Sequence, residues 1–247
     1  MASQSVRLIT WDATGTLLRV RGSVGEQYKA AGLLFGLASP RVTSLNAAFR
    51  EAYAHQSRLK PCYGSTCAGK SGANRWWASV VQETFNRCGV RDPPLIMKIA
   101  DYLYHEMKRP DRWEVFGDVH PTLSWCKTQG FRLGVLSNFD KRLNDILSGV
   151  GLRSYFDFVL TSDEMGTQKP QPEVFHLALK HTGVQAGQAV HIGDDPVTDY
   201  LGATSSGMAA FLLKRNKAAE LKSILIPPHR ILDSLDDLPP LLKAVST

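Results

Sequence analysis

The stretch Val6-Arg-Leu-Ile-Thr-Trp-Asp-Ala-Thr-Gly-Thr-Leu-Leu18 decides how the rest of the chain is interpreted. Residues 6–11 are rich in β-favouring side chains and partly alternate between apolar and polar, which predicts a strand. Asp12 then lies at the carboxyl end of this strand. In an open parallel α/β sheet, the carboxyl ends of the strands form the edge where ligands bind. Asp12 is therefore either a functional residue or an ordinary aspartate that caps a turn near Gly15.

The second half of the chain alternates between strand-like and helix-like segments. Strands are predicted at 131–136, 156–160, 189–192, 208–213 and near Ile231, and helices at 121–128, 143–150, 172–181, 196–206 and 235–245. This alternation predicts an α/β fold with a doubly wound parallel sheet. The Val6 strand must join the same sheet, because a lone strand cannot satisfy its edges.

Between these parts, from Val24 to about Arg109, the sequence is almost wholly helical, and strand character stops after Leu18. Periodic apolar residues predict four helices separated by proline- and glycine-containing breaks. We therefore expect three segments, which are core residues 1–17, an all-helical insertion at 18–118 and core residues 119–247. The crossings near Arg19–Gly22 and Gly117 are hinge candidates.

Two features of the insertion resemble functional motifs, but we favour ordinary structural explanations. Trp76 and Trp77 could line a substrate pocket, yet large aromatic residues at helical spacing are more often part of a core. The loop Pro61–Gly72 contains the glycine spacing and the Gly-Lys-Ser ending of a phosphate-binding P-loop. No strand precedes this loop, and the motif holds phosphate between a strand end and a helix N-terminus. A flexible loop is therefore expected.

Composition limits the classes of function. The chain has 247 residues, of which 43% are hydrophobic, so it can bury a substantial core in one large domain or two smaller ones. The formal charge of +6 and the pI near 9.2 suit an anionic substrate. The basic residues are dispersed and form no run typical of a nucleic-acid-binding arm. We therefore expect a small-molecule partner and no nucleic acid, and the sequence leaves the oligomeric state open.

Neither a membrane span nor a signal peptide is predicted. The longest apolar run, residues 30–38, is too short to cross a bilayer, and the N-terminus leads directly into the Val6 strand. We therefore expect no membrane association and an intracellular, cytoplasmic location. The four cysteines form no C-x-x-C pair, so reduced thiols are expected rather than a zinc site. A redox pair of Cys62 and Cys67 is the weaker alternative.

Polar residues follow three later parts of the predicted sheet. They are Ser137 and Asn138 after the 131–136 strand, Lys169 in a proline-containing loop, and Asp194, Asp195 and Asp199 after the 189–192 strand. Each has an ordinary alternative, with Ser137 as a helix cap, Lys169 as a solvated side chain and the aspartates as caps of the next helix. Together with Asp12, in this order, they are better explained by one phosphoryl-binding site.

These segments resemble the haloacid dehalogenase superfamily of hydrolases over nearly the whole chain. The matching motifs are D-x-x-G-T-L at Asp12–Leu17, Ser137-Asn138, Lys169-Pro170, and Gly193-Asp194-Asp195 with Asp199. The helical insertion resembles the cap of the subfamily that includes phosphoglycolate phosphatases and haloacid dehalogenases. The resemblance implies a Rossmann-like core, Mg²⁺ as cofactor and an aspartyl-enzyme intermediate formed with a small phosphorylated molecule.

The resemblance also implies a role for each matching residue. Asp12 would be the nucleophile, and Asp12, Asp194 and the backbone carbonyl of Thr14 would hold Mg²⁺, which prefers oxygen ligands. The phosphoryl group would be bound by Ser137, Asn138 and Lys169, and Lys169 would also neutralise charge during catalysis. Asp195 or Asp199 would orient Lys169 and a metal-bound water.

Thr14 departs from the pattern of the phosphatases. Phosphatases of this family usually carry a second Asp at this position, which protonates the leaving group and then activates water. A threonine hydroxyl cannot exchange a proton near neutral pH, and loss of general acid–base help costs about 100- to 10,000-fold. We therefore expect a weak phosphatase or phosphotransferase whose phospho-Asp12 hydrolyses slowly.

Two alternatives remain open because of Thr14. One is a catalytically impaired pseudoenzyme or binding module that keeps the fold for partner contacts. The other is a dehalogenase-type hydrolase, which uses the Asp nucleophile without the second Asp. Clustered carboxylates at Asp194, Asp195 and Asp199 argue against it, because a metal-free site gains little from them.

Overall fold

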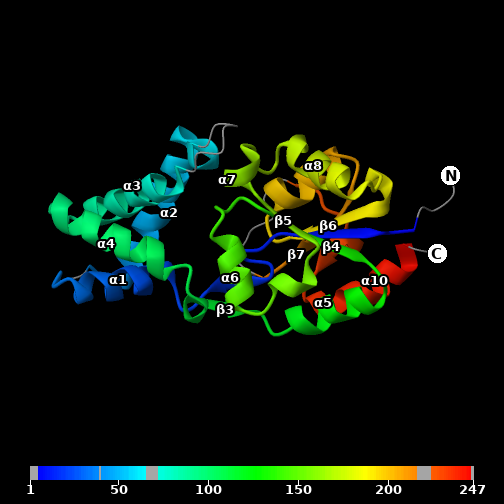
Figure 1. The fold of residues 1–247 in the computed structure, drawn as a ribbon, viewed down its shortest axis with the longest axis horizontal. Helices are drawn as coiled ribbons and strands as arrows, with labels where there is room; N and C mark the ends of the chain where they lie inside the picture. The colour runs from blue at the N-terminus through cyan, green and yellow to red at the C-terminus, as the bar shows by residue number, and fades with distance from the viewer. Residues whose placement is uncertain (1–4, 39, 65–71, 216–223, 246–247) are drawn as a thin grey trace.

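The main sheet of the protein has six parallel strands in the order β5-β4-β1-β6-β7-β8 (Figure 1). The computed structural model describes residues 5–38, 40–64, 72–215 and 224–245. The strands are β1 Leu8–Trp11, β4 Arg132–Ser137, β5 Phe158–Thr161, β6 Ala189–Gly193, β7 Ala209–Leu213 and β8 Ile231–Leu232. The prediction of a doubly wound α/β fold is confirmed.

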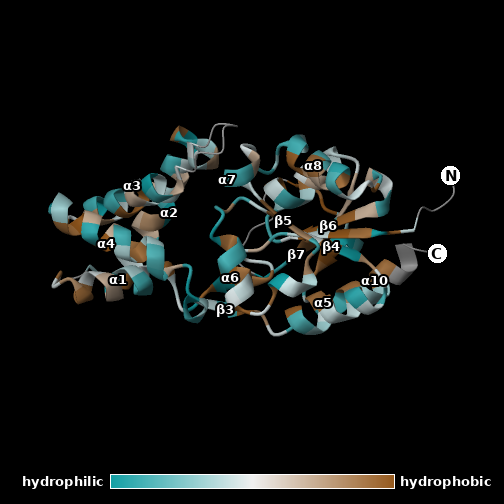
Figure 2. Cartoon of the chain, in the orientation of Figure 1, coloured by the Kyte–Doolittle hydropathy of each residue, from teal (hydrophilic) through white to brown (hydrophobic). Residues whose placement is uncertain are grey.

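Helices cover both faces of this sheet, as Figure 1 shows. One face carries α5 (Val119–Thr128), α6 (Leu143–Gly149) and α10 (Leu238–Val245), and the other carries α7 (Ser162–Met165), α8 (Pro172–Thr182) and α9 (Gly202–Ser205). Successive residues of β1 alternate between these layers, since Leu8 packs with α8 while Ile9 and Trp11 pack with α5 and α6. The strands of the sheet are predominantly hydrophobic (Figure 2), as expected for a sheet buried on both faces.

The predicted insertion contains four helices in its described part. They are α1 Val24–Leu34, α2 Val42–Leu59, α3 Ala73–Arg87 and α4 Pro93–Glu106. Their apolar faces form a cluster that is separate from the core of the sheet and includes Tyr28, Leu45, Phe85 and Ile99. Among the described residues of this stretch, none belongs to the main sheet. The helical character of the insertion is therefore confirmed.

The expectation that strand character stops after Leu18 is wrong. Strand β2 (Leu18–Val20) pairs antiparallel with β3 (Trp113–Val115) in a separate two-stranded sheet. Three residues are too few to show an alternating pattern, and the partner of Arg19 lies 95 positions away. This ribbon joins the two crossings between the sheet and the helices. The segment boundaries at 17/18 and 118/119 stay a prediction, and the ribbon lies beside both.

Other expectations fall partly or wholly outside the described residues. The P-loop-like stretch is described only at its two ends, with Pro61–Gly64 forming a 3₁₀ turn, η1, and Gly72 preceding α3. Cys67 lies outside the described part, so the proposed redox pair is not tested, whereas Cys62, Cys88 and Cys126 carry free thiols. Within the described ranges, no helix combines the length and apolar character that a membrane crossing requires.

Candidate active site

The loop after β1 presents Asp12 at the carboxyl edge of the sheet. The Asp12 backbone N–H donates to the Ile192 carbonyl at 2.8 Å, so the residue continues the pairing of β1 with β6. The chain then turns through Gly15, whose φ of +92° favours glycine. A Cβ atom at this position would also collide with the Asp194 carboxylate. Gly15 therefore allows the loops after β1 and β6 to approach each other.

Lys169 is buried between two carboxylates from different strand-end loops. Its Nζ lies 2.7 Å from Asp12 Oδ1 and 2.5 Å from Asp199 Oδ1, and only 2% of the residue is exposed. Asp199 Oδ1 is also 3.1 Å from His191 Nε2, and Asp199 Oδ2 accepts a hydrogen bond from the Asp195 backbone N–H. These contacts fix Asp199 in place, and Asp199 in turn orients the ammonium group that faces Asp12.

Three carboxylates lie close enough to share one cation. Asp12, Asp194 and Asp199 each offer one oxygen, and these oxygens all lie within 4.8 Å of one another. Asp199 is already bonded to Lys169 and Asp195, which leaves Asp12 and Asp194 as the freer pair. Three carboxylates facing one ammonium leave the site short of positive charge, and oxygen donors are those that Mg²⁺ prefers. The donor set therefore fits a divalent metal ion.

The pKa values of Asp12 and Asp194 also indicate that the site lacks positive charge. Burial raises the pKa of Asp12 to about 7, with further upward contributions from Asp199 and Asp194 and an opposing one from Lys169. Burial and the charge of Asp199 raise the pKa of Asp194 to about 6, against the effect of Lys169. Both carboxylates would thus be easier to ionise beside a second cation.

Lys169 and Asp199 shift in the directions expected of an ion pair. Burial alone would lower the pKa of Lys169, but the charges of Asp12 and Asp199 outweigh it and raise that pKa. Burial alone would raise the pKa of Asp199, but the Lys169 charge and the hydrogen bond from His191 hold it well below its usual value. Lys169 therefore stays protonated and Asp199 stays ionised at neutral pH.

Ser137 and Asn138 lie at the end of β4, where the sequence predicted them, but their side chains do different things. Ser137 is 3% exposed and lines the cavity in front of Asp12. The Asn138 amide is occupied, because its Nδ2 donates to the Lys169 carbonyl at 2.9 Å and its Oδ1 accepts from the Lys169 N–H at 2.8 Å. Asn138 therefore positions Lys169, and a contact with substrate would have to come from its backbone.

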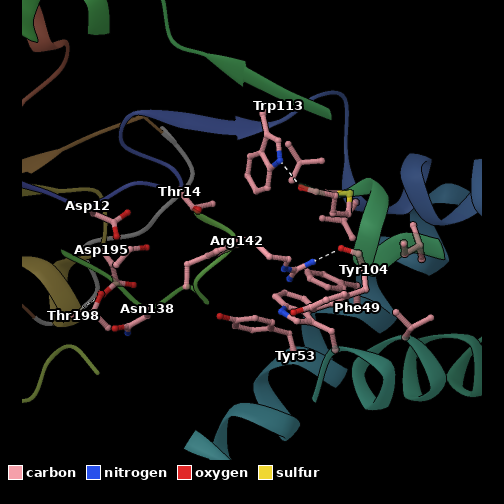
Figure 3. Close-up of a pocket in the computed structure, with 18 of the residues that line it drawn as sticks. Asp12, Thr14, Phe49, Tyr53, Tyr104, Trp113, Asn138, Arg142, Asp195 and Thr198 are labelled. Atoms are coloured by element: carbon pink, nitrogen blue, oxygen red, sulfur yellow. Dashed lines mark hydrogen bonds between the residues drawn. The ribbon is translucent and has the colours of Figure 1, made fainter. Parts of the chain in front are cut away.

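Asp195 and Thr14 complete the predicted set. Asp195 Oδ1 accepts hydrogen bonds from the backbone N–H groups of Val197 and Thr198, so it caps the π-helical turn Pro196–Leu201, as the capping alternative anticipated. Thr14 and Asp195 both line the cavity (Figure 3). The structure therefore brings Asp12, Thr14, Ser137, Asn138, Lys169, Asp194, Asp195 and Asp199 to one edge of the sheet.

A cavity of about 400 Å³ extends from this edge toward the helical insertion. Figure 3 shows Asp12 and Thr14 at one end and Phe49, Tyr53 and Tyr104 at the other. The expectation that both tryptophans are core residues is wrong for Trp77, which lines the cavity. Trp76 is 4% exposed and is a core residue, with its Nε1 donating to the Lys60 carbonyl. Adjacent residues on a helix point about 100° apart, so only one of the pair faces the core.

Sequence reasoning missed a buried ion pair that joins the two ends of the cavity. Asp140 accepts hydrogen bonds from Arg142 Nε at 2.8 Å and Arg142 Nη2 at 2.6 Å, and from Trp77 Nε1 at 2.7 Å. Arg142 Nη1 donates to the Tyr104 carbonyl at 2.8 Å. Asp140 is fully buried and Arg142 is 7% exposed. The only signal in the sequence was that Asp140 and Arg142 lie two and four positions after Asn138.

His191 was the second residue missed. It is fully buried in β6, 2.9 Å from Thr10 Oγ1 and 3.1 Å from Asp199 Oδ1. Burial lowers its pKa, against the opposing effect of Asp199. Its position two residues before Gly193 was visible in the motif, but a histidine inside a strand gives no sign of which loop it supports.

Comparisons with known proteins agree with this geometry. A family model described as haloacid dehalogenase-like hydrolase matches residues 6–207. The chain belongs to the haloacid dehalogenase-like hydrolases. Among its relatives is haloacid dehalogenase-like hydrolase domain-containing protein 3 of Danio rerio, which is 45% identical over 235 residues, or 95% of each chain. The resemblance predicted from the motifs is thus confirmed.

Solved structures of this hydrolase family share the fold. The 2-haloacid dehalogenase from Pseudomonas syringae pv. Tomato DC3000 matches with a TM-score of 0.65 and 25% identity, over 97% of this chain and 99% of that one. A HAD phosphatase from Thermococcus onnurineus matches with a TM-score of 0.62 and 24% identity, over 98% and 100%. Because a dehalogenase and a phosphatase match about equally well, the site must decide the chemistry.

Proposed function

We propose that this hydrolase is a weak Mg²⁺-dependent phosphatase or phosphotransferase that acts on a small phosphorylated molecule through an aspartyl-phosphate on Asp12. The observation that carries the proposal is the contact of Lys169 with both Asp12 and Asp199, beside Asp194. An anionic nucleophile can approach an anionic phosphoryl group only where fixed cations offset the repulsion. The same arrangement would destabilise the fold if it had no role, because it buries the Asp12 and Asp199 carboxylates and partly buries that of Asp194 around one lysine.

In the first step, an Asp12 carboxylate oxygen forms a bond to phosphorus as the bond to the leaving oxygen breaks and takes the electron pair with it. Lys169 offsets the charge of the phosphoryl group, and the Ser137 hydroxyl donates to one of its free oxygens. Asp12, Asp194 and the Thr14 carbonyl would hold Mg²⁺, which supplies Lewis-acid stabilisation of the phosphoryl oxygens when bound. Asn138 and Asp199 keep Lys169 in place from its backbone and its ammonium end.

In this proposal, Thr14 limits the rates of both steps, the phosphorylation of Asp12 and the hydrolysis of phospho-Asp12. Its hydroxyl cannot protonate the leaving oxygen, so alcohols that need protonation should leave slowly. Water must also attack phospho-Asp12 without a nearby general base. An alcohol or phosphate acceptor could then compete with water, which makes phosphotransfer as reasonable an outcome as hydrolysis.

We further propose that residues 18–118 form a cap that closes over the core segments 1–17 and 119–247. Contacts across the cavity support this division, since Tyr63 Oη donates to the Asn138 carbonyl at 3.1 Å and Trp77 donates to Asp140. The β2–β3 ribbon carries both chain crossings, so the hinge candidate near Arg19–Gly22 overlaps the end of β2 and the candidate near Gly117 follows β3. Closure would exclude water from Asp12.

A dehalogenase-type reaction is the second candidate, because Thr14 and an apolar cavity are compatible with it. In that reaction Asp12 would attack carbon and release halide. The excess of carboxylates at Asp194 and Asp199 disfavours it, since a metal-free site would leave them uncompensated. A non-catalytic binding module rests on Thr14 alone.

The deciding experiment measures turnover of 4-nitrophenyl phosphate with Mg²⁺ or with a chelator, for the wild type and Asp12→Asn. The matched control is Asp145→Asn, the same change at an exposed site on α6. We expect Mg²⁺-dependent turnover that Asp12→Asn abolishes and Asp145→Asn retains. Release of chloride from 2-chloropropionate without metal would instead support the dehalogenase, and absence of both reactions would support the binding module.

A further inference from the structure

The two ends of the active-site cavity differ in charge. The end beside the sheet is lined by Asp12, Lys169 and Asp194, which are the groups of the phosphoryl site. The other end is lined mainly by apolar and aromatic side chains of the insertion. They include Tyr28, Phe49, Tyr53, Trp77, Leu103 and Tyr104. We call this end the aromatic chamber, and a leaving group attached to the phosphoryl group would occupy it.

The one cation among the described residues of the chamber is already neutralised. Arg142 donates hydrogen bonds from Nε and Nη2 to the Asp140 carboxylate and from Nη1 to the Tyr104 carbonyl. Its guanidinium also lies over the Tyr104 ring, 4.0 Å from the ring centre. A leaving group with a negatively charged substituent, away from its leaving oxygen, would therefore place that charge in an apolar space without a free positive partner. Burying such a charge without a partner is strongly unfavourable.

A cationic leaving group is disfavoured by the same arginine. Trp77, Tyr104 and Phe139 could attract a cation through their ring faces, but Arg142 already lies within 5.8 Å of all three ring centres. The faces of these three rings are therefore already taken by Arg142 and are not free for a second cation. The polar groups that the insertion adds to the chamber include the neutral hydroxyls of Tyr28, Tyr53 and Tyr104, and Tyr28 is only 4% exposed.

Thr14 adds an independent restriction. Without an acid at this position, the leaving oxygen departs unprotonated, so its parent alcohol must be acidic enough to leave as an anion. Simple sugar and alkyl alcohols are poor in this respect, whereas phenols and enols are good. The chamber and Thr14 thus select for the same kind of molecule by different physical routes.

We propose, on the basis of the phosphatase function above, that the substrates are aryl or enol phosphates whose leaving group is largely apolar and carries no charged substituent. Asp12 takes the phosphoryl group, and the electron pair of the broken P–O bond leaves on the aryloxide or enolate oxygen. That oxygen picks up its proton from solvent after release. Water then attacks the phosphorus of phospho-Asp12, and the bond from phosphorus to the Asp12 oxygen breaks and returns its electron pair to the carboxylate. Inorganic phosphate is released, and the proton of the water passes to solvent. Sugar phosphates, phosphorylated acids and nucleotides do not fit the chamber.

The test compares phosphate esters of nearly equal shape. 4-Carbamoylphenyl, 4-carboxyphenyl and 4-(aminomethyl)phenyl phosphate share the ring and differ in the charge of the substituent. We expect kcat/KM for the neutral amide to exceed that for either charged ester by about tenfold or more, a difference of about 1.4 kcal/mol. Cyclohexyl phosphate, which is apolar but has a basic leaving oxygen, should react at least about 100-fold more slowly than phenyl phosphate.

The outcomes separate this inference from the function on which it rests. Asp12-dependent turnover with equal kcat/KM for the three para-substituted esters, or with cyclohexyl phosphate as good as phenyl phosphate, would overturn the substrate class and leave the phosphatase function intact. Absence of Asp12-dependent turnover of every ester would overturn the phosphatase function itself.

A variant tests the neutralised arginine directly. Asp140→Asn frees the Arg142 charge, so folded enzyme should accept the carboxyphenyl ester better, and the ratio of amide to carboxylate should fall about tenfold. Asp145→Asn makes the same change on the exposed face of α6 and should leave the ratio unchanged. An unchanged ratio in folded Asp140→Asn would overturn the role of Arg142. If Asp140→Asn does not fold, the wild-type series still decides the proposal.

Discussion

The two ends of the active-site cavity are built in opposite ways. At the sheet end, four short segments from four strand-end loops supply polar side chains, and the parallel topology alone brings them to one edge. At the insertion end, rings from α1, α2, α3 and α4 form a chamber whose members lie far apart in the sequence and share no motif. The motif residues of this hydrolase can therefore be located from short stretches of sequence, whereas the part of the cavity that we propose to select the substrate depends on how the helices pack.

The largest expected effect tests the sheet end at Thr14. Thr14→Asp should raise turnover of an alkyl phosphate by roughly 10- to 1,000-fold, because it supplies the missing acid and base. The gain should stay below the full general-acid effect, since the neighbouring residues were not arranged around a carboxylate. An aryl phosphate should gain less. Steady-state rates for both esters, with a burst measurement for phospho-Asp12, check this.

Thr14→Asn is the matched control, since it has the shape of aspartate but exchanges no proton near neutral pH. It should show no gain on either ester. Equal wild-type activity on alkyl and aryl phosphates, with no gain from Thr14→Asp, would mean that another group transfers the proton. The sheet end would then hold a catalytic residue that the motifs do not reveal.

The next largest effect, on kcat, is expected from loss of the hydrogen bonds that hold Lys169 in place at the sheet end. Asn138→Ala removes both hydrogen bonds to the Lys169 backbone and should lower kcat about tenfold, because Lys169 loses its fixed position opposite Asp12. KM should change little, since the amide does not face the substrate. Asn144→Ala, on α6, is the control. A change confined to KM would indicate that Asn138 binds substrate directly after all.

A smaller effect on KM is expected at the insertion end, where Trp77 lines the chamber and Trp76 does not. Trp77→Phe loses the donor to Asp140 and part of the chamber wall, so KM for an aryl phosphate should rise about three- to tenfold. Trp76→Phe loses a donor to the Lys60 carbonyl and should lower stability without changing KM. Kinetics and thermal melting of both variants are compared. A larger KM effect in Trp76→Phe would place the substrate elsewhere.

The sheet end could be predicted from the sequence because its signals are short and positional. A strand ending in Asp12 and one ending before Asp194 must lie at the same edge if both are parallel, so no distance information was needed. The partners of Lys169 were harder to predict. Asn138 bonds to the Lys169 backbone, and His191 bonds to Asp199, the carboxylate partner of Lys169. Both contacts depend on loop geometry, which residue types do not specify.

The chamber and the ribbon could not be predicted for a different reason. Whether Trp76 or Trp77 faces the cavity depends on the rotation of α3 against its neighbours, and both have the same intrinsic preference for burial. Strand β2 gains its order from β3, a pairing between segments too short to show a pattern on their own. The cation of the chamber, Arg142, is buried only because Asp140 neutralises it, and exposure is the default expectation for arginine.

The smallest effect on activity is expected at Asp118, which lies outside the cavity on the chain that returns from the insertion. Its carboxylate accepts hydrogen bonds from Arg215 Nη1 and Nη2, both at 2.7 Å, and from the Leu235 N–H and the Ser234 hydroxyl. Arg215 also donates to the Thr16 carbonyl, so this pair ties the returning chain to the Asp12 loop. Burial alone would raise the pKa of Asp118, but the Arg215 hydrogen bonds and charge, with those other donors, lower it.

Because the pKa of Asp118 is lower in the folded protein than in the unfolded one, its ionised form stabilises the fold above the unfolded pKa of about 3.9. That stability is lost as the pH falls through the folded value. Asp118→Asn should therefore lower the free energy of unfolding by about 2 kcal/mol at pH 7, and by progressively less below about pH 4. Activity at pH 7 should stay within about twofold. Urea titrations at several pH values measure the difference.

Asp111→Asn is the matched control for the charge. Asp111 also pairs with an arginine, Arg109 at 3.1 Å, but its side chain is 55% exposed, so the substitution should leave stability unchanged within error. If the Asp118→Asn difference does not depend on pH, hydrogen bonding rather than ionisation holds the junction. If activity falls as steeply as stability, the Asp118–Arg215 pair also sets the position of the Asp12 loop through the Thr16 carbonyl, and the sheet end of the cavity depends on more than its own motifs.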